Sequence, residues 1–242
     1  MTSIMSVLFL VVAIPITVYI LQNQKFNFQI NAFLNDEPQS ISVVDVRGAS
    51  VKITWMTEKS VIGMVKLSGD STKTFFEKES SSFHLVEVRN LQPGQEYTFS
   101  LLSDGVEYSK PEYKFTTASI LDEAGSSYLV YGQVFSVDGS TIQPSGLAYV
   151  QMNDGGKLSD KVPAVLNKAG GFQINLAGVL KSDHSGIFEY KKNLEVSVEV
   201  NFEVGKPSVT KKFTVDLSNN HQIPNIYLGD INIDVIPGIN GN

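Results

Sequence analysis

The 242-residue sequence contains no cysteine, 3 histidines and a single tryptophan. The absence of cysteine excludes a disulfide framework, a thiolate metal site and a cysteine nucleophile. The histidines are His84, His184 and His221, which lie far apart in the sequence and lack the spacing of a metal-binding motif. We therefore expect no cofactor and no catalytic metal, and a fold that is stabilised by the packing of its core alone.

Positive charge is also scarce. The sequence has 19 Lys and Arg against 25 Asp and Glu, which gives a formal net charge of −6 at pH 7. No basic cluster interrupts this excess of negative charge, so the sequence disfavours nucleic acids and anionic lipid surfaces as partners. About 220 residues follow the one long apolar run, which is enough for two domains of ordinary size.

That apolar run extends from Ile4 to Leu21 and reads IMSVLFLVVAIPITVYIL. Roughly 18 apolar residues are near the lower limit for a helix that crosses a hydrocarbon core of about 30 Å, and exceed the ~7–15 apolar residues of a cleaved signal peptide. The run therefore predicts a membrane anchor, with a cleaved signal peptide as the alternative. The first basic residue, Lys25, follows the run, so charge gives little indication of orientation.

Helical periodicity of usable length is absent after Leu21, and short alternating runs separated by turn residues replace it. Between Ser40 and Thr117 we expect seven strands, in the runs ISVVDV, VKITWM, VIGMVKL, TFF, FHLVEV, YTFSLL and YKFTT. Gly, Asn, Asp and Pro lie between the runs. Short strands at this spacing are typical of an antiparallel β-sandwich.

Two features indicate how this first sandwich is built. The single tryptophan, Trp55, lies in an alternating run whose apolar side should form the centre of the core. Further along, a Pro-Gly turn precedes a tyrosine that opens the next strand, so its hydroxyl can bond back to the crossover as a tyrosine corner. The residues to which we assign these structural roles are Trp55, Leu91, Pro93, Gly94 and Tyr97.

The runs WMT, NLQPGQEYTFSL and KFTT together resemble a fibronectin type III domain that covers residues 38–118. The stretch from Phe83 to Gly94 also resembles the sandwich that precedes the catalytic part of purple acid phosphatases. A binuclear metal centre needs several converging Asp, Asn and His ligands, and the 3 dispersed histidines cannot supply them. The catalytic part implied by the second resemblance is absent from the sequence.

Strand patterns resume at Tyr128, in the runs YLVYGQVF, GLAYVQM, GGFQINLAGV, NLEVSVEVNFEV, VTKKFTVDLS and PNIYLG. The motifs VYGQV, GLAYV and AGGFQI resemble the carboxypeptidase regulatory-like or transthyretin-like sandwich over residues 127–229. This resemblance implies an accessory or spacer module. Gly132 is expected to allow close packing at a strand, and Gly170 with Gly171 to make the turn before Phe172 enters the core.

Few residues are candidates for chemistry. Asp183, His184 and Ser185 are the residue types of a nucleophilic triad, but consecutive positions in a polar loop cannot orient one another. The run from Asn153 to Gly156 is expected to be a turn, because it lacks the helix N-terminus that makes glycine-rich loops bind phosphate. Neither pattern predicts an active site.

The tail carries oxygen side chains at alternate positions, Asp230, Asn232 and Asp234, and so resembles half of a dockerin-type calcium repeat. A working loop needs glycine at its sixth position and a carboxylate at its twelfth, where this chain has Val235 and Gly241. We therefore expect no tight calcium site, and a final strand is the alternative interpretation.

The predicted fold class is all-β, with two tandem antiparallel β-sandwiches of the immunoglobulin or fibronectin type III kind after one N-terminal transmembrane helix. The expected parts are an anchor or signal (1–24), a juxtamembrane stalk (25–37), the fibronectin-like domain (38–118), a linker (119–126), the second sandwich (127–229) and a C-terminal tail (230–242).

This arrangement resembles that of bacterial membrane-anchored cell-surface proteins. It predicts a non-enzymatic extracellular protein for adhesion, binding or spacing, with a protein or carbohydrate partner of unknown identity. The alternative is an accessory module that binds carbohydrate or positions the catalytic part of an extracellular hydrolase, such as a phosphoesterase or glycosidase. An exposed aromatic platform would favour that alternative, and the tyrosines to inspect are Tyr108, Tyr113, Tyr128, Tyr131 and Tyr190.

Overall fold

A computed structural model of the chain describes residues 36–68, 73–119, 128–216 and 221–229. Every regular element in these ranges is a β-strand, and none of the described residues belongs to a helix that could cross a membrane. The predicted anchor from Ile4 to Leu21, the stalk up to Asn35, most of the linker and the tail from Asp230 onward lie outside these ranges. The chain divides into two units, Met1–Asp36 and Glu37–Asn242, and all described strands belong to the second.

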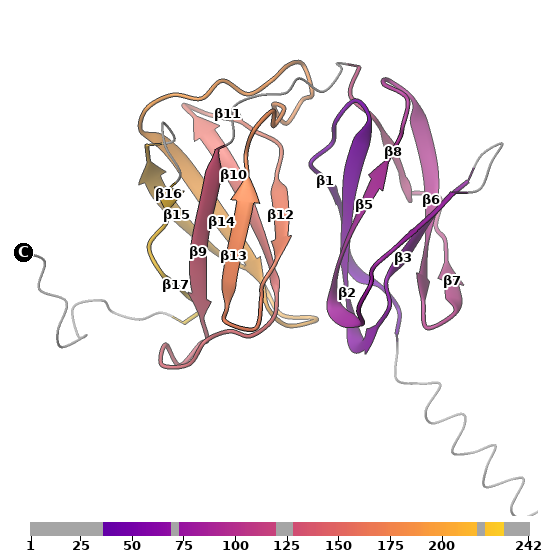
Figure 1. Ribbon diagram of the computed structural model, residues 1–242, viewed down its shortest axis with the longest axis horizontal. Coiled ribbons are helices and arrows are strands. Elements are labelled where there is room, and N and C mark those ends of the chain that lie inside the picture. Colours follow the sequence, from indigo (N-terminus) through magenta and orange to yellow (C-terminus); the bar gives the residue numbers. More distant parts are fainter. Residues whose placement is uncertain (1–35, 69–72, 120–127, 217–220, 230–242) are drawn as a thin grey trace, which may run out of the picture. The chain divides into compact units, whose positions relative to one another are not determined.

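The first sandwich consists of two antiparallel sheets (Figure 1). One sheet has the strand order β1-β2-β5, and the other has the order β4-β3-β6-β7 with β8 also paired to β6. Its strands are β1 (Gln39–Val44), β2 (Ser50–Val61), β3 (Met64–Ser68), β4 (Lys73–Phe76), β5 (Ser81–Arg89), β6 (Glu96–Ser103), β7 (Val106–Tyr108) and β8 (Lys114–Thr116). Each of the expected runs overlaps at least one of these strands, and VIGMVKL overlaps two, because Val61 ends β2 and Met64 begins β3. Strand β7 was not expected, and it follows β6 through a turn at Asp104 and Gly105, which both have positive φ.

The core of the first sandwich forms where the inward residues of its two sheets meet. Antiparallel register sets Ile53 opposite Val86 and Trp55 opposite His84 on β2 and β5. Ile53 and Trp55 are fully buried, and they pack in one cluster with Phe99 of β6. Strand alternation therefore directs one side of β2 into this core.

The second sandwich has strands β9 (Leu129–Phe135), β10 (Leu147–Asp154), β11 (Lys157–Leu158), β12 (Val162–Val165), β13 (Gly171–Asn175), β14 (Leu194–Asn201), β15 (Val209–Val215), β16 (His221–Gln222) and β17 (Ile226–Tyr227). One sheet has the order β11-β10-β14-β15, with β12 also paired to β10, and the other has the order β13-β9-β16, with β17 also paired to β9. Strands β16 and β17 pair with β9 in parallel. The prediction of wholly antiparallel sandwiches is wrong at this edge, because a chain that crosses over from the opposite sheet can enter beside β9 in its own direction.

Gly132 shows how closely the second core is packed. A Cβ atom at this position would lie 2.9 Å from Cγ1 of Ile223 and 3.0 Å from Cζ of Phe172. Both side chains belong to the core, which also contains Val130 and Val134 at no measurable exposure. Glycine at this point of β9 therefore leaves room for Ile223 and Phe172 to cross the strand.

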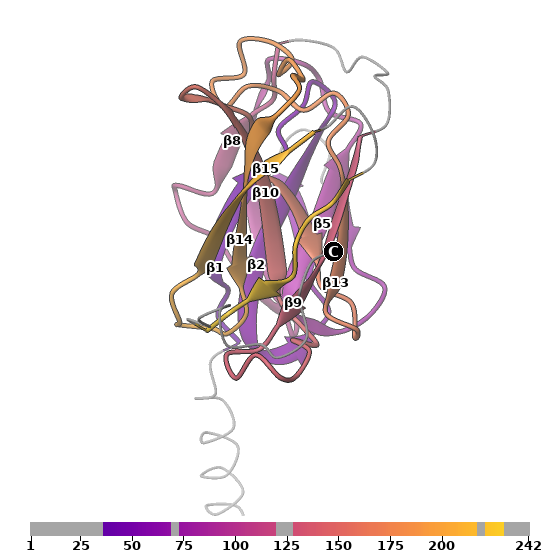
Figure 2. The same cartoon turned by 90° about the vertical axis from the view of Figure 1, so that its left-hand side faces the viewer.

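A third apolar cluster joins the two sandwiches within the unit Glu37–Asn242. It contains Val44, Met56 and Phe83 of the first sandwich with Leu147 and Tyr149 of the second. We call this cluster the joint. Strands β5 and β12 also contact each other beside it, and Figure 2 views the strands of the second sandwich in front of those of the first.

The joint explains an unusual burial pattern in β2. Thr54 and Met56 are as deeply buried as Ile53 and Trp55, although alternation directs the two pairs to opposite faces. One face of β2 packs in the first core, and the other faces the second sandwich. The two sandwiches are thus in direct contact through apolar side chains, rather than connected only by the linker.

Candidate functional site

Trp55 lies at the centre of the first sandwich. Its side chain is fully buried and stacks on the ring of His84, with 4.7 Å between centroids and an interplanar angle of 17°. No part of the ring is available to a ligand at the surface. Leu91 is 4% exposed in the same core cluster.

Tyr97 makes the hydrogen bond that defines a tyrosine corner. The backbone N–H of Gln92 donates to the Tyr97 hydroxyl at 2.8 Å. Gly94 has a φ of 68°, and its N–H donates to the carbonyl of Ala118 at 3.0 Å. In the bond to Gln92 the Tyr97 hydroxyl is the acceptor, and Gln92 is an exposed residue whose N–H water can reach.

The same crossover is held from the other side by Thr117, which sequence reasoning did not single out. Its buried hydroxyl donates to the carbonyl of Gln92 at 2.6 Å and accepts a hydrogen bond from the N–H of Gln95 at 3.0 Å. A threonine directly after the closing strand β8 is too common a residue to signal this role from sequence alone.

We expect Tyr97→Phe to lower the free energy of unfolding by about 0.5–1.5 kcal/mol, because the exposed N–H of Gln92 can bond to water once the hydroxyl is gone. Thr117→Val should cost more, about 1–3 kcal/mol, since it removes two hydrogen bonds of a buried hydroxyl rather than one. Denaturant titrations of the two variants test this order. A larger loss for Tyr97→Phe than for Thr117→Val would contradict it.

A second cluster in the first sandwich has the geometry of a catalytic triad. Nε2 of His84 lies 2.9 Å from the hydroxyl of Thr57, and Nδ1 lies 2.7 Å from Oε2 of Glu77. Thr57 and His84 are both fully buried. The Thr57 hydroxyl also donates to the carbonyl of Lys59 at 2.6 Å, so it is neither accessible to a substrate nor free to give its proton to the imidazole.

Glu77 gives this cluster a structural role instead. Its Oε1 accepts a hydrogen bond from the N–H of Leu85 at 2.8 Å, and its Oε2 accepts one from the N–H of Gly63 at 3.2 Å. Strand β5 is at the edge of its sheet, so the carboxylate occupies a backbone donor that a further strand would otherwise use. Glu77 therefore blocks one pairing position at a sheet edge, and the three residues are too far apart in sequence to be recognised as a group.

The sequence pattern at Asp183, His184 and Ser185 forms a turn rather than a triad. The N–H of Ser185 donates to Oδ1 of Asp183 at 2.9 Å, and the hydrogen bonds from Ser185 lower the pKa of Asp183. His184 has a φ of 56°, and its Nε2 points to Asp160 at 3.7 Å. In the turn after β10, the N–H of Gly156 donates to Oδ1 of Asn153 at 2.8 Å.

Polar groups from both sandwiches meet beside the joint. Oδ2 of Asp160, in the second sandwich, accepts a hydrogen bond of 2.7 Å from the N–H of Val46 in the first, and the N–H of Asp45 donates to the carbonyl of Lys161 at 3.0 Å. A buried hydrogen bond of 2.9 Å also links Thr54 to the hydroxyl of Tyr149. The first two contacts connect the segment after β1 to the segment before β12, and the third connects β2 to β10.

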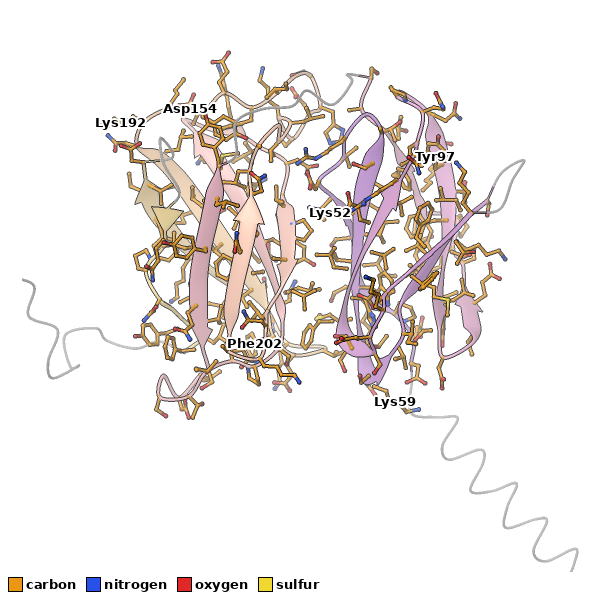
Figure 3. All side chains as sticks on the ribbon, viewed as in Figure 1. Lys52, Lys59, Tyr97, Asp154, Lys192 and Phe202 are labelled. Atoms are coloured by element: carbon orange, nitrogen blue, oxygen red, sulfur yellow. The ribbon has the colours of Figure 1, made fainter. Side chains whose placement is uncertain are left out.

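Asp45 is the charged centre of this polar region. It is 3% exposed, and two cations neutralise it: Nε of Arg47 lies 2.9 Å from Oδ1, and Nζ of Lys52 lies 2.7 Å from Oδ2. Lys52 is labelled in Figure 3. Arg47 continues across the joint, where its Nη2 donates to the carbonyl of Ala177 at 3.3 Å. One guanidinium thus serves an ion pair in the first sandwich and a backbone contact to the second.

Burial raises the pKa of Asp160 above the ordinary value for an aspartate, and the nearby charge of Asp45 raises it further. The N–H groups of Val46 and Lys161, which donate to its two oxygens, and the neighbouring His184 act in the opposite direction. Because burial dominates, the native chain retains the Asp160 proton at pH values where the unfolded chain has lost it. Stability contributed by this group therefore falls as the pH rises between the two pKa values.

The variant Asp160→Asn tests whether the stability contributed by Asp160 falls as the pH rises. The variant cannot titrate at this position, so the free energy of unfolding of the wild type minus that of the variant should decrease as the pH rises from about 3 to about 7. Both oxygens of Asp160 accept N–H groups, so the amide should also cost about 1–3 kcal/mol at every pH. Urea titrations at several pH values measure both effects, and a difference that grows with pH would contradict the assignment.

Side chains that could hold a metal ion do not gather within residues 36–68, 73–119, 128–216 and 221–229, where no group of three or more His, Asp or Glu has suitable geometry. The half-loop of Asp230, Asn232 and Asp234 lies outside these ranges. The expectation that it binds no calcium tightly therefore stays a prediction.

The tyrosines considered for an aromatic platform differ in exposure. Tyr113 is 5% exposed and stacks on Phe99. Tyr128 and Tyr190 stack on each other with 4.2 Å between centroids, and burial raises the pKa of Tyr190 to about 12. Tyr131 is 40% exposed, and it alone of these five is among the exposed large apolar side chains of the described residues.

No protein-family model matches the sequence, and no curated protein matches it. Solved structures similar to this chain include a domain of a biofilm-associated protein, at 12% identity and a TM-score of 0.26, over 74% of this chain and 29% of that one. A segment of two fibronectin type III domains from chicken tenascin has 13% identity and a TM-score of 0.25, over 74% and 100% of the two chains. A minor pilin from Streptococcus agalactiae has 11% identity and a TM-score of 0.26, over 76% and 88%.

The chain thus spans 29% of the length of the biofilm-associated protein. At these identities and TM-scores the likenesses carry no information on function, and the function proposed below is inferred from the residues of this chain. The structure itself establishes that the regular elements of the described residues are all β-strands, arranged in two sandwiches.

Proposed function

We propose that this chain is a non-enzymatic cell-surface protein that presents a binding surface on two sandwiches packed directly against each other. The joint is the observation that carries this proposal. Met56 and Leu147 meet there at 1% and 0% exposure, and polar contacts beside them connect Val46 to Asp160. Two sandwiches that share a buried cluster transmit position and force better than two domains on a flexible linker.

Anchoring belongs to the same proposal. Residues 1–24 would hold the chain in the membrane through the run from Ile4 to Leu21, and the sandwiches would lie on the outer side. The low content of Lys and Arg suits a surface that makes no use of nucleic acid or anionic lipid. We also propose that the second sandwich is a transthyretin-like module, which would serve as a spacer.

Fractionation of cells that express the full chain tests the anchor. We expect the full chain in the membrane fraction after alkaline washing, and a variant without residues 1–24 in the soluble fraction. Protease added to intact cells should degrade the sandwiches of the full chain. A soluble full chain, or a mature N-terminus between Gln22 and Phe33, would contradict the anchor and favour a cleaved signal peptide.

A further inference from the structure

One exposed sheet face of the second sandwich combines aromatic rings with amides. Val130 and Val134 of β9 are fully buried in the core, so alternation directs the residues next to each of them in the strand outward. These outward residues include Tyr131, Gln133 and Phe135. The face belongs to the sheet β13-β9-β16 with β17, which is not the sheet that contributes Leu147 and Tyr149 to the joint.

Neighbouring strands extend this face on both sides of Tyr131. Gln173 of β13 and Gln222 of β16 are its direct cross-strand partners, and both are exposed. The side chains of such partners are neighbours about 5 Å apart at Cβ. We call this surface the amide–aromatic face, and it consists of Leu129, Tyr131, Gln133, Phe135, Gln173, Asn175, Gln222 and Tyr227.

The aromatic rings of this face lie in two places. Tyr131 is 40% exposed in the middle of the sheet. Phe135, four residues further along β9, stacks on Tyr227 of β17 with 5.2 Å between centroids and an interplanar angle of 25°. Four residues of strand correspond to about 13 Å, so the face offers two apolar platforms separated by a distance that an extended ligand can span.

The face is also neutral. None of the eight residues that define it is charged, although 18% of the sequence is Asp, Glu, Lys or Arg. A charged ligand would lose water on this face without gaining a partner of opposite charge, which is unfavourable. Glutamine and asparagine amides can both donate and accept hydrogen bonds, and therefore suit a ligand rich in hydroxyl groups.

We propose that the amide–aromatic face binds an uncharged polysaccharide. The apolar sides of sugar rings pack on Tyr131 and on the Phe135–Tyr227 pair, and sugar hydroxyls bond to the amides of Gln173 and Gln222. The inference rests on the proposed function, because a chain that faces outward can meet such a polymer. A ligand on this face contacts side chains rather than the backbone of β9, because that backbone is already paired on both sides.

Electrophoresis of the full chain in native gels that contain a polysaccharide tests the proposal. Hydroxyethylcellulose, laminarin and soluble starch serve as uncharged probes, and alginate serves as the charged one. We expect at least one uncharged polymer to slow migration, with Tyr131→Ala weakening the apparent affinity roughly tenfold or more. Gln173→Ala, which removes an exposed amide, should weaken it several-fold, about 3-fold.

The matched control is Phe76→Ala, which removes a 68% exposed aromatic side chain from the first sandwich and should leave migration unchanged. Three results would overturn the proposal: no retardation by the uncharged polymers, retardation by alginate alone, or equal retardation of the wild type and Tyr131→Ala. Sedimentation that shows Tyr131-dependent self-association would also overturn it and assign the face to a second copy. Fractionation tests the proposed function separately, so an anchored chain that fails to bind these polymers would refute the polysaccharide alone.

Discussion

Replacing Trp55 by alanine should lower the free energy of unfolding by about 3–5 kcal/mol, the largest loss we expect from a single substitution in the first sandwich. The side chain is fully buried, so its removal leaves a cavity that Ile53 and Phe99 in the same cluster cannot fill. The stacked contact with His84 at 4.7 Å is lost as well. Urea denaturation followed by far-UV circular dichroism measures the effect.

Trp55→Phe is the matched control. Phenylalanine retains an aromatic ring beside His84, and it removes an indole N–H for which the described residues provide no hydrogen-bond partner. We therefore expect a loss well below that of Trp55→Ala. If the alanine variant were as stable as the wild type, Trp55 would not be the centre of the core.

The second large effect concerns the joint. Leu147→Ala should lower the free energy of unfolding by about 2–5 kcal/mol, because Leu147 is fully buried between the two sandwiches and packs with Met56 and Phe83. Leu158→Ala makes the same chemical change at a 39% exposed position of the same sandwich, and it should stay within about 0.5 kcal/mol of the wild type. Equal, small losses in the two variants would mean that the joint is not a packed interface.

The first sandwich could be anticipated in detail because its signals are local. Alternation around Trp55 and the Pro93-Gly94 turn before Tyr97 each depend on a few consecutive residues, which strand geometry and turn chemistry constrain directly. The positions of the expected runs and the burial of Trp55 follow from these local rules.

Other strands gave little signal in the sequence. Pro163 interrupts the run that forms β12, and proline is tolerated there because β12 lies at the edge of its sheet. Strands β11 and β16 are two residues long and carry no periodicity. The parallel pairing of β16 and β17 to β9 depends on a crossover, which no local pattern encodes.

The joint and the amide–aromatic face could not be located from sequence for a different reason. The burial of Thr54 and Met56 depends on Leu147 and Tyr149, more than 90 residues away in the chain. Tyr131 was one of five tyrosines considered for an aromatic platform, and only the cross-strand register sets it between Gln173 and Gln222. Contacts of this kind follow from topology rather than from the order of neighbouring residues.

The most direct test of the joint is whether a substitution that destabilises one sandwich also lowers the stability of the other. Leu176 is fully buried in the core of the second sandwich, and the single tryptophan of the chain, Trp55, lies in the first. Leu176→Ala should therefore lower the urea midpoint measured by Trp55 fluorescence together with the midpoint measured by circular dichroism, because the two sandwiches unfold as one cooperative unit. A Trp55 midpoint that remains at the wild-type value while the second sandwich unfolds earlier would show that the sandwiches are independent, and would contradict the joint.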